Sequence, residues 1–183
     1  LQKSVPEEVS MAAYKPRVLV GQSNQSVRFS TLADDEEPDN TYIQLGNVLH
    51  NVFSSIRTTA DIDQALLKLE QEGIIYDQDI TRQRLGQLIR KRLEDRRVAD
   101  WFSPRWTVYN ECDIILPDGG TRRPDRVMTD GKETIVVDFK FGRERDEYHQ
   151  QVHEYMELLT QMGLPEVSGY LWFVYSNKIV KVK

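Results

Sequence analysis

The chain has 183 residues, of which 39% are hydrophobic and 29% are charged. This composition suits one folded domain with a short appendage and excludes disordered and fibrous chains. The formal net charge is −5, from 24 Lys and Arg against 29 Asp and Glu, and taken alone it argues against a nucleic-acid partner. A single cysteine, Cys112, excludes an internal disulfide and an all-cysteine metal site. With no signal-peptide pattern and no apolar run near the ~20 residues of a membrane-spanning helix, we expect a cytoplasmic protein without a membrane partner.

The chain begins with Leu1 rather than Met, so we expect a fragment of a longer protein or a processed product. Residues 1–40 contain three of the seven prolines and end in the acidic stretch Asp34–Asp39. No helical or strand period persists there, which predicts a linker or lead-in that precedes a domain spanning residues 41–183.

Apolar residues recur at helical spacing in three segments before Pro104. We expect these helices to start after Tyr42, at about Asp61 with Gly73 as C-cap, and near Asp79. Beyond Pro104 the period changes to two, which is typical of strands. The predicted strands are Trp106–Leu116, Thr121–Met128, Glu133–Lys140, Gly169–Tyr175 and Ile179–Val182, with a helix containing Tyr148–Met162 after the third. This order predicts an α/β (α+β) fold, a mixed sheet flanked by helices, with an N-terminal helical segment.

Two carboxylates and an amine are predicted to converge on the central hairpin. If Asp130-Gly131 is a two-residue turn, Asp125 opposes Val136. Because side chains alternate along a strand, Asp125, Asp138 and Lys140 then share one face. Crowded carboxylates raise each other's pKa unless a cation lies between them, and oxygen ligands suit Mg²⁺ or Mn²⁺.

A lysine beside such an ion orients or deprotonates an attacking water, or stabilises charge on a phosphorane-like transition state. The pattern therefore favours metal-assisted phosphodiester hydrolysis. The alternative is an ion pair between Asp138 and Lys140 on an edge strand, with Asp125 capping a turn.

Pro124-Asp125 followed by Asp138-Phe139-Lys140 resembles the PD-(D/E)xK nuclease superfamily. The flanking residues resemble its RecB/AddA-type branch, in which the nuclease domain is fused C-terminally to a UvrD-like helicase. The stretch from Gly46 to His50 matches the G-x-x-x-H of that branch, Gln151 and Tyr155 match its Q-x-x-x-Y, and Glu111 is the candidate for its strand glutamate.

The resemblance covers most of the chain and implies a restriction-endonuclease-like mixed sheet over residues 41–183. It implies a Mg²⁺- or Mn²⁺-dependent deoxyribonuclease, an exonuclease acting in DNA double-strand-break repair and recombination. Its partners would be DNA and an upstream UvrD-like helicase region. The implied catalytic residues are Asp125, Asp138 and Lys140, and the implied metal ligands are His50, Asp125, Asp138 and the carbonyl of Phe139. Gln151 and Tyr155 would hold the substrate backbone or the lysine.

Three accessory positions keep a second interpretation. His50 lies roughly 120° from the centre of its helix's apolar stripe, so solvent exposure is the alternative to metal ligation. Glu111 shares a face with Asp125 only if the turn near Gly119 has an odd loop length, and an even loop places Cys112 there instead. Cys112 is otherwise interpreted as a small buried apolar residue. For Tyr155 the alternative is a place in the core, which is the commoner place for a tyrosine.

The net charge conceals a basic segment, because residues 82–97 hold seven Lys and Arg against two acidic residues. This segment is either the solvated face of a helix or a stripe that contacts DNA phosphates. The arginines assigned to nucleic-acid binding are Arg90 and Arg92 from the helix and Arg122, Arg123 and Arg126 from the hairpin. No G-x-x-x-x-G-K-[ST] loop occurs, so no ATPase site of that type is expected.

The sequence therefore favours a divalent-metal-dependent DNA nuclease. The alternative is a catalytically inactive nuclease-like module that binds DNA or docks a partner. A degenerate module of that kind usually lacks the lysine or one aspartate, and both are present here.

Overall fold

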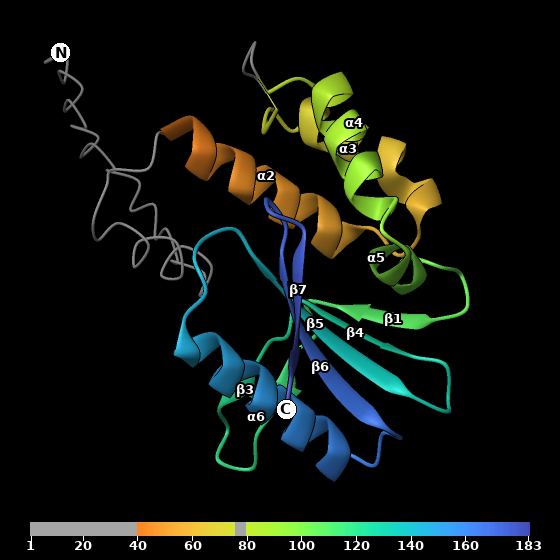
Figure 1. Ribbon diagram of the computed structural model, residues 1–183, viewed down its shortest axis with the longest axis vertical. Coiled ribbons are helices and arrows are strands. Elements are labelled where there is room, and N and C mark those ends of the chain that lie inside the picture. The colour runs from red at the N-terminus through yellow and green to blue at the C-terminus, as the bar shows by residue number, and fades with distance from the viewer. Residues whose placement is uncertain (1–39, 76–79) are drawn as a thin grey trace, which may run out of the picture. The chain divides into compact units, whose positions relative to one another are not determined.

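The computed structural model describes residues 40–75 and 80–183. Among these residues, five helical elements come first and seven strands follow, with one further helix between the fifth and sixth strands. Figure 1 shows their arrangement. In chain order they are α2 (Asn40–Ser55), η1 (Thr59–Asp61), α3 (Ile62–Gln71), α4 (Arg82–Leu93), α5 (Arg96–Trp101), β1 (Thr107–Asn110), β2 (Ile114–Ile115), β3 (Thr121–Arg122), β4 (Arg126–Thr129), β5 (Thr134–Lys140), α6 (Asp146–Gln161), β6 (Val167–Phe173) and β7 (Lys178–Val182). The predicted lead-in lies outside the described residues, except for Asn40, with which α2 begins.

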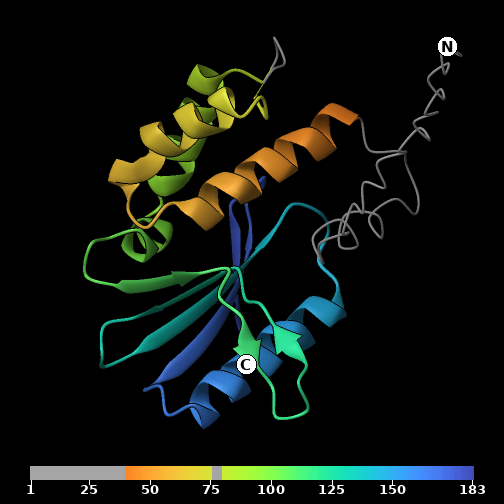
Figure 2. The same cartoon turned by 180° about the vertical axis from the view of Figure 1, so that it is seen from behind.

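The core is a five-stranded mixed sheet in the order β1-β4-β5-β6-β7. Only β5 and β6 are parallel, and α6 connects them, as a parallel pair requires a crossover. Helix α6 packs on one face through Val152, Tyr155 and Leu159. On the other face, Phe53 of α2 contacts Phe139 and Trp172. The predicted mixed α/β class is confirmed, with α2 and α6 on opposite sides of the sheet (Figure 2).

The helical predictions are confirmed in position. The apolar stripe of α2 is buried from Val48 to Phe53, and α3 ends two residues before Gly73, which has a φ of 71°. Helix α4 begins at Arg82, later than expected, because the Thr81 hydroxyl caps it by accepting the Arg84 N–H at 3.3 Å. Within the described ranges, no helix combines the length and apolar character needed to cross a membrane.

The predicted strands Trp106–Leu116 and Thr121–Met128 are wrong as continuous strands. Each is divided in two, and β2 and β3 pair as a separate two-stranded sheet. The break falls where Glu111 adopts a left-handed φ of 50° and where Pro124 has no N–H to donate to a ladder. The hairpin formed by residues 107–129 therefore bends at Glu111 and Pro124, so that β2 and β3 leave the main sheet. Ile114 of β2 packs into the core beneath α6.

The predicted register of β4 and β5 is wrong by two residues. Thr129 pairs with Thr134 and Arg126 with Val137, so the loop holds four residues rather than two. The Asp130 side chain explains the longer loop, because its Oδ1 accepts the N–H groups of Lys132 and Glu133 at 2.9 and 3.0 Å. A shift of two preserves the alternation of faces, so the predicted convergence on one face survives.

Candidate functional site

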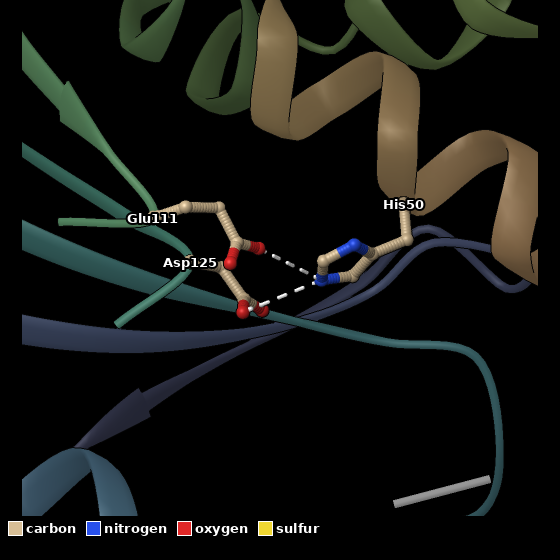
Figure 3. A group of neighbouring side chains, drawn as sticks. All are labelled: His50, Glu111 and Asp125. Carbon is tan, nitrogen blue, oxygen red and sulfur yellow. Dashed lines mark hydrogen bonds and ion pairs between the residues drawn. The ribbon is translucent and has the colours of Figure 1, made fainter. Parts of the chain in front are cut away.

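Three side chains from distant parts of the chain meet at the corner of the hairpin (Figure 3). His50 comes from α2, Glu111 follows β1, and Asp125 precedes β4. His50 Nε2 lies 3.4 Å from Asp125 Oδ1 and 3.5 Å from Glu111 Oε1. The ligand atoms of the three groups all lie within 4.8 Å of one another. His50 and Asp125 are buried, and the Glu111 side chain is 24% exposed, so the group opens to solvent on the glutamate side.

Backbone hydrogen bonds fix the two carboxylates at this corner. Asp125 Oδ2 accepts the Phe139 N–H at 2.7 Å, which leaves Oδ1 facing His50. The Glu111 N–H donates to the Asp125 carbonyl at 3.1 Å. The aspartate is therefore anchored to β5, and the glutamate is anchored to the aspartate's own backbone.

Glu111, and not Cys112, shares the site with Asp125. Ile115 pairs with Thr121, so the intervening loop has an odd length, the condition that the sequence left open. Cys112 is exposed, and its interpretation as a buried residue is wrong, because the chain turns at Glu111 and carries the next residue away from the sheet.

His50 is buried, so the alternative of simple exposure is wrong. Its ring lies 6.3 Å from the rings of both Phe139 and Phe141. The face of α2 outside the main apolar stripe is covered by the end of β5, which a helical projection of the sequence does not include.

The charges at the site are strongly coupled. Burial lowers the pKa of His50, but the hydrogen bond to Asp125 and the charges of Asp125, Glu111 and Asp138 outweigh it, so the pKa is raised overall. Burial, and then the charge of Asp125, raises the pKa of Glu111. A positive charge is therefore favoured among these groups, whether it is a proton or a metal cation.

Lys140 lies on the face of β5 that carries Asp138, as the alternation predicted, and its ammonium contacts the Asp138 carboxylate. It also donates to Gln151 Oε1 at 3.3 Å. Gln151 Nε2 donates to the Tyr155 hydroxyl at 2.7 Å, and that hydroxyl donates to the Arg123 carbonyl at 3.3 Å. This chain of directed bonds holds the lysine, which is one of the two roles expected for Gln151 and Tyr155. Tyr155 is also part of the core.

The predicted metal ligands are only partly brought together. His50 and Asp125 belong to the three-residue group, and Glu111 joins them as a full member rather than an accessory. Asp138 lies outside that group, beside Lys140, although its charge acts on His50. Ligation by Asp138 and by the Phe139 carbonyl stays a prediction.

Ser54 is the residue at this site that the sequence reasoning missed. Its hydroxyl lies 3.1 Å from Glu111 Oε1 and 3.3 Å from His50 Nδ1. The signal was present, because Ser54 stands four residues after His50 and so lies on the same side of the helix.

The assignment of Arg126 to nucleic-acid binding is wrong. Its side chain is fully buried, with its guanidinium 4.2 Å from the centre of the Phe102 ring. It donates to the carbonyls of Ile56, Arg57 and Trp101 and to the side-chain oxygen of Asn110. It therefore ties α2, α5 and β1 together.

The other four predicted arginines reach the surface to different extents, each with a partner. Arg122 pairs with Glu154 and Arg123 with Asp113, both at 2.8 Å. Arg90 of α4 pairs with Asp63 of α3, and Arg92 donates to the Tyr175 carbonyl. Contacts between these residues and DNA stay predictions.

No model of a known protein family matches the chain, and no curated protein is similar to it. The resemblance to nucleases therefore stays a prediction from the motif residues named above.

Proposed function

We propose that residues 41–183 form a divalent-metal-dependent deoxyribonuclease domain with a restriction-endonuclease-like core. Support comes chiefly from the grouping of His50, Glu111 and Asp125 next to the contact between Asp138 and Lys140. A nuclease that uses a metal ion needs an anionic pocket for the cation and a cationic group for the phosphate charge. Both lie at the end of β5.

The donor set fits a divalent cation. Two carboxylates and one imidazole nitrogen converge, and carboxylate ligands suit Mg²⁺ and Mn²⁺. A bound ion would polarise a phosphoryl oxygen and lower the pKa of a coordinated water. His50, Glu111 and Asp125 would hold it, with Asp138 as a further ligand or as the partner that orients Lys140.

Lys140 would balance the charge that develops on the phosphoryl oxygens and help position the attacking water. Its orientation is set by Asp138 on one side and by Gln151 on the other. In hydrolysis the water oxygen bonds to phosphorus and a phosphorus–oxygen ester bond breaks. A fixed ammonium beside the reacting phosphate lowers that barrier without reorganisation.

Exonuclease action, a role in DNA double-strand-break repair and recombination, a cytoplasmic location and an upstream UvrD-like helicase partner belong to the same proposal. They depend on the motif resemblance alone. The alternative, a catalytically inactive module that binds DNA or a partner, is disfavoured by the presence and mutual contact of Lys140 and Asp138.

The test is cleavage of end-labelled single- and double-stranded linear DNA by the full chain in Mg²⁺, Mn²⁺ or EDTA. We expect cleavage in either metal, none in EDTA, and a loss of ~100-fold or more in Lys140→Met. Lys132→Met is the matched control, because Lys132 is exposed in the β4–β5 loop, and it should cleave like the parent. Equal cleavage by Lys140→Met and the parent would refute the mechanism. Metal-dependent DNA binding without cleavage would favour the inactive module.

A further inference from the structure

Ser54 lies beside two members of the proposed metal group, His50 and Glu111, although it is not one of the three donors. It is half-buried on α2, one helical turn after His50. Its Oγ lies 3.3 Å from His50 Nδ1 and 3.1 Å from Glu111 Oε1, the same glutamate oxygen that lies 3.5 Å from His50 Nε2. One hydroxyl therefore touches two of the three groups that converge on the site.

The direction of these two hydrogen bonds follows from the count of protons. A serine hydroxyl has one proton to donate and lone pairs to accept with, and an ionised carboxylate only accepts. The Ser54 hydroxyl therefore donates its hydrogen bond to Glu111, and the serine oxygen accepts one from His50. For that contact to be a hydrogen bond, Nδ1 of His50 must carry the ring proton.

With the Nδ1 proton held by Ser54, Nε2 is the ring nitrogen at which a cation can replace a proton. Nε2 faces Asp125 Oδ1 at 3.4 Å, as a hydrogen bond, and Glu111 Oε1 at 3.5 Å. When a cation takes the place of the Nε2 proton, Nε2 and two carboxylate oxygens around one space form its donor set. The partner of the distal nitrogen commonly fixes which nitrogen of a histidine binds a metal.

We propose that Ser54 is the positioning residue that makes His50 a metal ligand, by holding the proton on Nδ1 and directing the bare Nε2 toward the ion. The same hydroxyl restrains the Glu111 carboxylate, so one side chain fixes the orientation of two ligands. This inference rests on the proposed function, because it requires that the site binds a divalent cation.

The test uses Mn²⁺ alone as the probe, with its affinity for the full chain measured by titration calorimetry. We expect Ser54→Ala to weaken Mn²⁺ binding ~10- to 100-fold, the usual effect of losing such a partner. Ser54→Thr keeps the hydroxyl and should bind within ~3-fold of the parent. Ser55→Ala is the matched control, because the neighbouring Ser55 donates to the Val52 carbonyl of its own helix, and it should leave the affinity unchanged.

A double-mutant cycle separates positioning from general stability. In a His50→Ala background, Ser54→Ala should weaken Mn²⁺ binding by no more than ~3-fold. The ring that Ser54 orients is absent there, and only its hydrogen bond to Glu111 remains to be lost. In the Mg²⁺-loaded parent, ¹⁵N NMR should find the His50 proton on Nδ1.

Each contrary result has a distinct meaning. Parental Mn²⁺ affinity in Ser54→Ala, even with lower stability to urea, overturns the inference while the proposed function stands. A loaded His50 protonated on Nε2 also overturns it. A parent chain that binds no Mn²⁺ overturns both this inference and the proposed function.

Discussion

Replacing Arg126 by methionine, compared with the same change at Arg123, tests whether Arg126 stabilises the fold and Arg123 binds DNA. Arg126 is fully buried, and its two terminal nitrogens donate to four oxygens. Arg123 has a side chain that is 52% exposed and pairs only with Asp113 among its acidic neighbours. Methionine is unbranched and fills a similar space in both positions, so each variant removes the charge with little change of shape.

The size of the effect at Arg126 follows from two opposing contributions. Hydrogen bonds from a charged donor contribute ~1.5–3 kcal/mol each, so losing four costs ~6 kcal/mol at the lower end of that range. Burial lowers the pKa of Arg126 to about 10, which corresponds to ~3 kcal/mol of desolvation that methionine does not incur. The expected net loss is about 3 kcal/mol, a large share of the ~5–15 kcal/mol of a typical domain.

At Arg123 the expected changes are reversed. An exposed ion pair contributes no more than ~1 kcal/mol, so the free energy of unfolding should change by less than that. If Arg123 contacts a DNA phosphate, Arg123→Met should weaken DNA binding and reduce its salt dependence by about one phosphate contact.

The assays are urea denaturation and fluorescence anisotropy with labelled DNA over a range of salt concentrations, in Ca²⁺ to suppress turnover. We expect Arg126→Met to lose stability and Arg123→Met to lose DNA affinity. Arg126→Met that unfolds like the parent but binds DNA more weakly would show that Arg126 reaches the phosphates, and the reasoning from burial would fail.

Two further predictions concern packing and the lysine anchor. Gly169→Ala should lose ~1–3 kcal/mol of unfolding free energy, because its Cβ would lie 2.5 Å from the Met156 sulfur. Gly86→Ala, whose Cβ meets only the flexible end of an arginine within 3 Å, should gain up to ~1 kcal/mol from helix propensity, and urea denaturation that ranks the two variants the other way contradicts this. Tyr155→Phe removes the hydroxyl that orients Gln151 and should slow DNA cleavage ~10-fold, at unchanged Mn²⁺ affinity and with a stability change of about 1 kcal/mol. A parental cleavage rate in this variant would mean that the bond chain does not position the lysine.

The parts of the fold that depend on periodicity could be predicted from the sequence. The stripe of α2, the strand that is β5 and the helix that is α6 all follow from the spacing of apolar residues. The face shared by Asp125, Asp138 and Lys140 also depends only on alternation, so it survived a register error of two residues.

The remaining features depend on tertiary contacts or on local turn chemistry. The four-residue loop at Asp130 arises from a side-chain cap that competes with the two-residue turn. The burial of His50 comes from a surface that a helical projection omits. Arg126 resembles its exposed neighbours in sequence, and only the carbonyls that surround it in space distinguish it.

The corner at Glu111 has a consequence for how this position can change over evolutionary time. A left-handed backbone conformation costs a residue with a side chain roughly 1–2 kcal/mol that glycine does not incur, and Glu111 adopts one with φ at 50°. Glycine at this position would relieve the strain and remove one of the three clustered donors. Selection for stability alone would therefore favour losing the carboxylate, and its persistence in a lineage would be a sign of selection on the chemistry of the site.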